Sequence, residues 1–222
     1  MSDQNYKIGK ELKHEWYLII IFFLIIAVTI LAYPHLPEKI VTHWNLEGKP
    51  DGFSSRFTGV SLIPFITLGI YGLMLVAPLL DPRKENYVKF LKAYRLIKLG
   101  IFLFLLGTQL LIIAFNLGYN VNIGKIITLG LGVLFALLGT YLPQIKHNYF
   151  IGIKTPWTLA NEKVWQQTHR LGGKLFLISG FLIMLSVFLP DKPRFWLLMI
   201  LLIGSSFIAM VYSYFLFKNE QK

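Results

Sequence analysis

The chain has 222 residues, 55% of them hydrophobic, with 22 lysines and arginines against 11 aspartates and glutamates. This composition, with a mean hydropathy of +0.58, is typical of one compact membrane domain and excludes a soluble protein with a tail. The lack of cysteine excludes disulfides, thiolate catalysis and cysteine-ligated metals.

Six long apolar stretches divide the chain, at residues 17–33, 60–80, 96–117, 123–142, 175–189 and 195–217. A helix rises about 1.5 Å per residue, so roughly 20 residues cross a hydrocarbon core about 30 Å thick. Four stretches are long enough to span it. The first reaches this length only with the preceding Trp16, and the fifth only with residues 171–173. We therefore predict an all-α membrane protein with six transmembrane helices.

The segments between these stretches alternate in lysine and arginine content. Six of the 22 basic residues fall on one side of the predicted bundle, and all the others, Lys222 included, fall on the side of the two termini. The six are Lys39, Lys49, Arg56, Lys125, Lys192 and Arg194. Because segments rich in lysine and arginine stay in the cytoplasm, both termini are predicted to be cytoplasmic. The charge of +11 is interpreted as this orientation signal plus attraction to membrane lipids, without direct binding of nucleic acid.

Polar side chains are scarce inside the predicted spans. No Asp, Glu, His or Arg lies in the middle of a stretch, whereas a coupled transporter normally needs an ionisable group near the midplane. Thr108, Gln109 and Asn116 are interpreted as interhelical hydrogen-bonding groups, with a transport pathway as the alternative.

Small residues recur every fourth position along the fourth stretch, at Thr128, Gly132, Ala136 and Thr140. Small side chains at this spacing let two helices approach closely. The partner is either another helix of this chain, which we favour, or a second copy.

Residues 34–59 form the sizeable segment predicted to face outward. Residues 40–44 suit a short strand, and residues 45–48 and 49–52 carry the Asn, Gly, Pro and Asp of two successive tight turns. We expect a small ordered lid or a hairpin. His35, His43, Glu47 and Asp51 match no known metal-ligand spacing, so no metal or other cofactor is predicted.

Residues 36–56, LPEKIVTHWNLEGKPDGFSSR, resemble the signature of a small bacterial membrane module. That module often stands at the N-terminus of proteins of the SdpI-type immunity family. The resemblance implies that an external toxin meets this loop at His43, Trp44, Asn45, Gly48, Asp51 and Gly52.

Residues 143–174 form the largest segment predicted to be cytoplasmic. Gly152 and the pair Thr155–Pro156 interrupt any helix, after which Asn161 or Thr158 can cap a new one. Apolar residues at helical spacing then predict a short amphipathic helix with a tryptophan anchor that runs into Gly172–Gly173. Its face is interpreted either as lying on the lipid surface or as docking a cytoplasmic protein.

The same segment carries the hallmark motif of the SdpI-type family nearly intact. The matching residues are Asn148, Tyr149, Gly152, Lys154, Thr155, Pro156, Trp157, Thr158, Asn161, Trp165, Thr168, His169, Arg170, Gly172 and Gly173. Lys154 stands where many relatives carry arginine, so an anion contact there would be a point-charge contact. On this basis the chain is identified as a member of the family, with residues 1–95 as a two-helix module and residues 96–222 as a four-helix core.

The resemblance implies a membrane protein without enzymatic activity that protects its producer from a secreted peptide or protein toxin. It also implies signalling, in which the motif surface holds a cytoplasmic winged-helix autorepressor at the membrane when toxin is present. Such coupling requires toxin binding to favour one conformation over another. The sequence leaves the oligomeric state open.

Other classes of function are weighed against this one. His147, Asn148 and His169 can be drawn as an acid–base group of an intramembrane enzyme, but Glu162 is the only carboxylate nearby in sequence and no catalytic motif occurs. A transporter is disfavoured by the apolar helix centres. A general scaffold or stress protein of the same fold, without toxin specificity, remains the main alternative.

Overall fold

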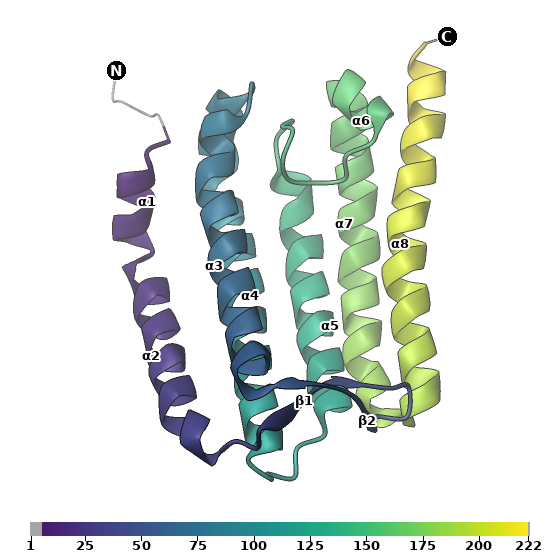
Figure 1. Cartoon of the computed structure of the whole chain (residues 1–222). Coiled ribbons are helices and arrows are strands. Elements are labelled where there is room, and N and C mark those ends of the chain that lie inside the picture. The colour runs from purple at the N-terminus through teal and green to yellow at the C-terminus, as the bar shows by residue number, and fades with distance from the viewer. Residues whose placement is uncertain (1–5, 222) are drawn as a thin grey trace.

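The computed structural model describes residues 6–221, and its long helices stand side by side with both termini at one end and a β-hairpin at the other (Figure 1). We call these the terminal end and the hairpin end. The long helices are α2 (Trp16–Ala32), α3 (Arg56–Leu80), α4 (Leu91–Asn116), α5 (Ile123–Tyr141), α7 (Glu162–Leu185) and α8 (Asp191–Glu220). Shorter helices are α1 (Ile8–His14) and α6 (Pro156–Ala160), with 3₁₀ turns at Tyr33–His35, Lys84–Phe90, Leu142–Gln144 and Ser186–Phe188.

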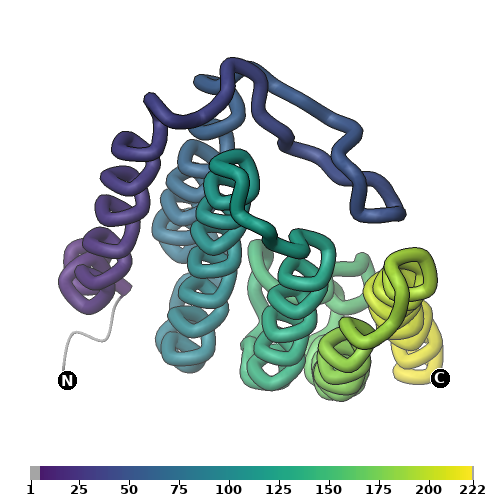
Figure 2. Tube along the Cα trace, turned by 90° about the horizontal axis from the view of Figure 1, so that it is seen from below, coloured from purple at the N-terminus to yellow at the C-terminus, as the bar shows by residue number. Residues whose placement is uncertain are grey.

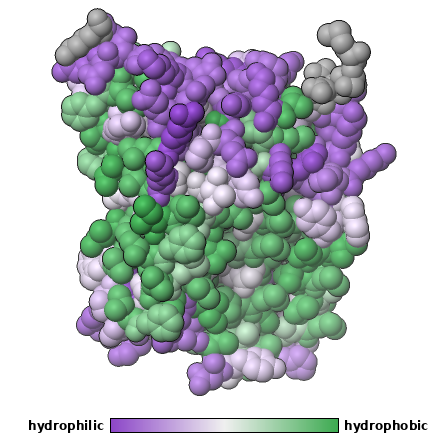
Figure 3. All heavy atoms as spheres, turned by 180° about the vertical axis from the view of Figure 1, so that it is seen from behind, coloured by the Kyte–Doolittle hydropathy of each residue, from purple (hydrophilic) through white to green (hydrophobic). Residues whose placement is uncertain are grey.

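Each of the six long helices is long and apolar enough to cross a membrane, which confirms the predicted spans. Apolar side chains cover a broad belt of the surface, while hydrophilic ones gather at the terminal end (Figure 3). Hydrocarbon solvates such a belt well, whereas water would not. The protein is therefore a multi-pass membrane protein. Lys222, one of the basic residues counted above, lies outside the described residues.

Helices α5 and α7 pack so closely that side chains are excluded between them. A Cβ added to Gly139 would lie 2.3 Å from the Leu177 nitrogen, and one added to Gly180 would lie 2.5 Å from the Ala136 nitrogen. Gly132 and Ala136 of the predicted stripe thus meet another helix of the same chain, as favoured above, whereas Thr140 is exposed.

The polar residues of α4 join elements of the fold. Gln109 Nε2 donates to the Val60 carbonyl oxygen at 2.9 Å, and Asn116 exchanges hydrogen bonds with both backbone groups of Val41. Thr108 instead donates to Phe104 within its own helix. Interhelical bonding is confirmed for Gln109, and Asn116 ties α4 to the hairpin.

The hairpin consists of β1 (Lys39–Trp44) and β2 (Pro50–Ser55), paired antiparallel with an irregularity near His43. Ile40 anchors it, because this side chain is fully buried in a cluster with Leu36, Val60 and Ile112. The predicted strand and first turn are confirmed. The second predicted turn, at residues 49–52, is wrong, because this segment pairs with β1 as the start of β2.

Helix α7 begins at Glu162, where the Asn161 side chain accepts hydrogen bonds from two backbone N–H groups. The helix then continues without interruption through Gly172 and Gly173 into the span. The expected amphipathic helix is therefore the first part of the span itself. Its apolar face does not lie on lipid, because Val164 and Trp165 are buried against protein.

Candidate functional site

Two sets of motif residues lie at opposite ends of the molecule. The hairpin carries the first set, and the segment between α5 and α7 carries the second (Figure 1). The structure therefore brings the predicted residues of each set together but keeps the two sets at opposite ends of the bundle.

The hairpin tip is shaped by Asn45. Its Oδ1 accepts hydrogen bonds from the backbone N–H groups of Glu47, at 2.9 Å, and Lys49, at 3.0 Å. Gly48 has a φ of +71°, a conformation that glycine adopts without strain. Asn45 and Gly48 thus build the turn, which explains their place in the motif without requiring a toxin contact.

His43 and Asp51 form an exposed pair across the two strands. His43 Nδ1 lies 2.6 Å from Asp51 Oδ1, and the side chains are 71% and 41% exposed. Gly52 lies opposite His43, and a Cβ there would approach the His43 Cβ to 2.6 Å. Within residues 6–221 no group of three His, Cys, Asp or Glu side chains is placed to hold a metal ion.

The hairpin tip docks on the start of α8. Glu47 pairs with Lys192 at 2.9 Å and with Lys49 at 3.2 Å. The hydrogen bond from Lys192 holds the pKa of Glu47 below its usual value. The hairpin therefore reaches from α3 across the bundle to α8, as the view along the helices shows (Figure 2).

Trp44 points into the protein from the end of β1. Its ring packs edge-on against Phe115 with centroids 5.1 Å apart, and its Nε1 is buried without a hydrogen-bond partner in the described structure. The side chain also lines a cavity of about 370 Å³ beneath the hairpin. Trp44 is therefore a wall of that cavity.

At the terminal end, Asn148 holds the motif loop in shape. Its Nδ2 donates to the carbonyl oxygens of Lys146 and Ile151, and its Oδ1 accepts from the N–H groups of Phe150 and Ile151. Because Asn148 is fully buried, these bonds replace the water that the loop backbone would otherwise need. Asn148 is a structural centre of the loop.

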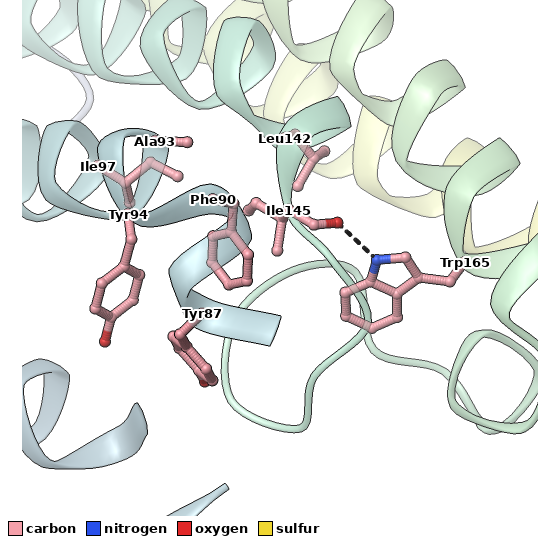
Figure 4. Packing of buried hydrophobic residues seen from close by; sticks show 8 residues of the cluster. All are labelled: Tyr87, Phe90, Ala93, Tyr94, Ile97, Leu142, Ile145 and Trp165. Carbon is pink, nitrogen blue, oxygen red and sulfur yellow. Dashed lines mark hydrogen bonds between the residues drawn. The ribbon is translucent and has the colours of Figure 1, made fainter. Parts of the chain in front are cut away.

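Trp165 is stacked between two histidines. Its ring centroid lies 4.9 Å from that of His147 and 4.1 Å from that of His169, both nearly parallel. Trp165 Nε1 donates to the Ile145 carbonyl oxygen at 2.9 Å (Figure 4). All three side chains are at most 1% exposed, so they are beyond the reach of a docking partner.

His169 uses both ring nitrogens in this packing. Nδ1 donates to the Trp165 carbonyl oxygen at 2.8 Å, and Nε2 accepts from the Ile153 N–H at 3.1 Å. A Cβ on Gly152, whose φ is +120°, would lie 2.4 Å from that Nε2, so only glycine fits. This arrangement leaves His169 no free nitrogen for proton transfer.

His147 is buried differently, because neither of its ring nitrogens has a partner among the described residues. Burial lowers the pKa of His147, and the nearby positive charge of Arg83 lowers it further. The neutral ring is therefore the form that the stack favours.

The motif divides into a buried framework and an accessible rim. The framework also contains Thr155 and Thr158, which form a capping box at the start of α6, and Thr168. We define the motif rim as the exposed residues Lys154, Pro156 and Arg170 together with the half-buried Trp157. The ring centroid of Trp157 lies 5.1 Å from that of Tyr214.

Asp81 was not predicted from the sequence, yet it ties α3 to the motif loop. Its Oδ2 accepts from the Tyr149 N–H at 2.8 Å and from the Tyr87 hydroxyl at 3.1 Å, and it is 2% exposed. Its position directly after an apolar span was the available signal, since a carboxylate there is buried only with partners.

Comparison with known proteins supports a family assignment. Residues 144–213 match the SdpI/YfhL protein family, and residues 20–68 match a domain of unknown function, DUF1648. "Immunity protein SdpI" of Bacillus subtilis (strain 168) is 30% identical over 201 residues, which cover 90% of this chain and 94% of the relative. No solved structure matches the chain. With its buried motif framework and its full-length similarity to this relative, the chain belongs to the SdpI/YfhL family of integral membrane proteins.

Proposed function

We propose that this protein protects the cell that makes it from a secreted peptide or protein toxin, and that it does so without catalysis. The observation that carries the proposal is the similarity to an immunity protein along nearly the whole chain, including both ends of the bundle. The lack of a free nitrogen on His169 is consistent with a non-enzymatic role.

The proposed orientation places the hairpin end outside the cell. Among residues 6–221, only six lysines and arginines belong to the segments at that end, whereas the other 15 belong to the terminal end. A cytoplasmic terminal end satisfies the tendency of basic residues to remain inside. The hairpin is then the surface that an external toxin meets first.

Within the hairpin, we assign the toxin contact to the exposed His43–Asp51 pair and its surroundings. Asn45, Gly48 and Gly52 serve this surface indirectly, because they shape the turn and leave room for His43. Trp44 contributes from beneath, as part of the cavity wall.

The signalling role is proposed for the motif rim only. A repressor docking at the terminal end can touch Lys154, Trp157 and Arg170, whereas Trp165, Thr168 and His169 are buried. The framework would then transmit a change in helix packing to the rim, and the two basic side chains would favour an acidic partner surface.

The test is survival of a toxin-sensitive strain that expresses the protein and is challenged with candidate peptide toxins. We expect protection by the native chain and reduced protection by the double variant Asn45→Ala, Asp51→Ala, which disturbs the turn and the strand pair. The double variant Lys84→Ala, Lys89→Ala at the opposite end is the matched control. Undiminished survival with the hairpin variant would reject the toxin contact, and no survival with any toxin would favour the scaffold alternative.

A further inference from the structure

We propose that the cavity beneath the hairpin binds an anionic amphiphile, namely a hydrocarbon chain that ends in a phosphate or carboxylate. The cavity has a volume of about 370 Å³, is lined by the hairpin and by residues of α3, α4, α5 and α8, and is partly open to the outside. This binding goes beyond the protective role, because it concerns a resident ligand and can be measured without any toxin.

The interior of the cavity suits a hydrocarbon chain. Its walls include Leu111, Ile112, Ile127 and Leu198. The hydroxyls of Thr108 and Thr128, which also line it, already donate to carbonyl oxygens of their own helices at 2.8 and 2.7 Å. The interior thus offers no free donor.

Two of the polar groups that line the cavity, on Arg194 and Trp44, have hydrogen-bond donors to spare. Arg194 is 4% exposed, and its guanidinium bonds with Asp191 and with the Leu189 carbonyl oxygen. A guanidinium has five N–H groups, so those two bonds leave donors over. Trp44 Nε1 is a further buried donor without a partner in the described residues. Two such donors call for an acceptor, and a phosphate or carboxylate head supplies it.

Asp191 also lines the cavity, and its negative carboxylate would repel an anionic head that came close to it. It lies on the rim, with 40% of the side chain exposed, and is paired with Arg194. The head therefore meets the unused N–H groups of Arg194 and Trp44, while Asp191 stays hydrated on the solvent side.

An apolar crevice continues the cavity along the outside of the bundle. It lies between α4 and α5, has a volume of about 450 Å³, and shares Thr108, Leu111 and Ile127 with the cavity. Leu103 and Leu110, which line the crevice, are exposed on the apolar belt. A chain whose head is held at Arg194 can thus run directly into the lipid phase.

A peptide segment fits this space less well than a hydrocarbon tail. Each peptide unit brings an N–H and a carbonyl group that must be paired away from water. The hydroxyls of Thr108 and Thr128 already donate within their own helices, so they can accept from a peptide N–H but cannot donate to a peptide carbonyl group. The geometry therefore favours an amphiphile over a toxin segment.

The experiment uses the full chain, purified in detergent and stripped of lipid, with binding followed by native mass spectrometry. Hexadecyl phosphate and palmitate represent single-chain anions, phosphatidylglycerol represents a two-chain membrane source, and hexadecanol and phosphatidylcholine control for the head. We expect the single-chain anions or phosphatidylglycerol to bind at least about tenfold tighter than the matching control, because hydrogen bonds to a charged head are lost otherwise. The compound that binds most tightly then shows whether the natural ligand is a single-chain anion or a membrane phospholipid.

Two variants locate the site. Gly107→Leu places a side chain in the crevice, and Gly204→Leu on α8 is its matched control, because an added Cβ meets nothing within 4 Å at either position. We expect Gly107→Leu to weaken binding at least about tenfold and Gly204→Leu to leave it unchanged. Arg194→Gln should remove the preference for a charged head, while Arg194→Lys keeps most of it.

Equal binding by the two glycine variants would overturn the proposal, as would equal affinity for charged and neutral heads in the native chain. Binding of an apolar toxin peptide that Gly107→Leu abolishes, with hexadecyl phosphate unaffected, would overturn it in favour of a peptide site. Should Arg194→Gln fail to fold, the glycine pair still decides.

Discussion

Glu15, at the junction of α1 and α2, pairs with Lys98 inside α4: Lys98 Nζ lies 2.8 Å from Glu15 Oε2. The two side chains are 0% and 1% exposed. The Tyr71 hydroxyl donates to the same oxygen at 3.0 Å, and Arg95 makes a bidentate pair with Glu11 beside it. A charged cluster thus joins the first helices to α3 and α4 at the terminal end.

Removing one partner of this buried pair should destabilise the protein strongly. Lys98→Met leaves the Glu15 carboxylate buried and unpaired, which costs about 3–5 kcal/mol in comparable cases. The double variant Glu15→Gln, Lys98→Met should recover most of that loss. Thermal unfolding in detergent measures both, and an equal loss in the single and double variants would contradict the account.

Trp165→Ala should cost about 3–5 kcal/mol, because it removes a buried indole stacked between two histidines together with its hydrogen bond to Ile145. Trp157→Ala should cost much less, since that side chain is half-buried. The comparison is made on purified protein by thermal unfolding. Equal losses would show that Trp165 is not a structural centre of the motif.

The six spans could be predicted because each hydrophobic stretch forms most of the membrane-crossing part of one helix, although α7 begins at Glu162, well before its stretch at residues 175–189. The buried charges could not. Lys98 stands at the start of the third apolar stretch, and nothing in the sequence shows that a carboxylate 83 residues away, Glu15, pairs with it. Arg194 is likewise buried. It pairs with Asp191, three residues earlier, and it lines a cavity that the sequence does not reveal.

The motif at the terminal end could be located from the sequence, but the roles of its residues could not be separated. Helical spacing placed Trp165 and Thr168 on one face, yet it did not tell whether lipid, a partner or the protein covers that face. The loop of residues 145–153 covers it, because Gly152 brings the backbone against His169. The division at residue 95 stays a prediction.

Gly139→Ala should destabilise the bundle by about 1–3 kcal/mol, because its Cβ would lie 2.3 Å from the Leu177 nitrogen and force α5 from α7. Gly72→Ala on α3 is the matched control, since its Cβ meets nothing within 4 Å. That control should be neutral or up to about 1 kcal/mol more stable. The unfolding temperature of each variant is compared with that of the unaltered protein. If neither variant lowers it, the close packing of α5 against α7 at Gly139 does not contribute to stability.

Acid should weaken the terminal end through His147. Burial lowers its pKa in the folded state, so the unfolded chain binds more protons as the pH falls below about 6.5. Stability contributed by the neutral ring is therefore present above that pH and lost below it. His147→Phe keeps the stack on Trp165 and should reduce the fall in unfolding temperature between pH 7 and pH 5, roughly the range in which histidine gains its charge. The exposed His35→Gln variant should leave the fall unchanged, and an unaltered fall in His147→Phe would contradict this assignment.

The proposed protective role depends most on which end of the bundle faces outward, and cysteine labelling in whole cells tests that directly. The chain has no cysteine, so Lys49→Cys and Lys163→Cys each introduce a single thiol at a surface lysine, 73% and 62% exposed, one at each end. A membrane-impermeant maleimide should label Lys49→Cys in intact cells, and Lys163→Cys only after the membrane is opened. Labelling of Lys163→Cys but not Lys49→Cys in intact cells would place the hairpin in the cytoplasm and remove the surface on which protection is proposed to begin.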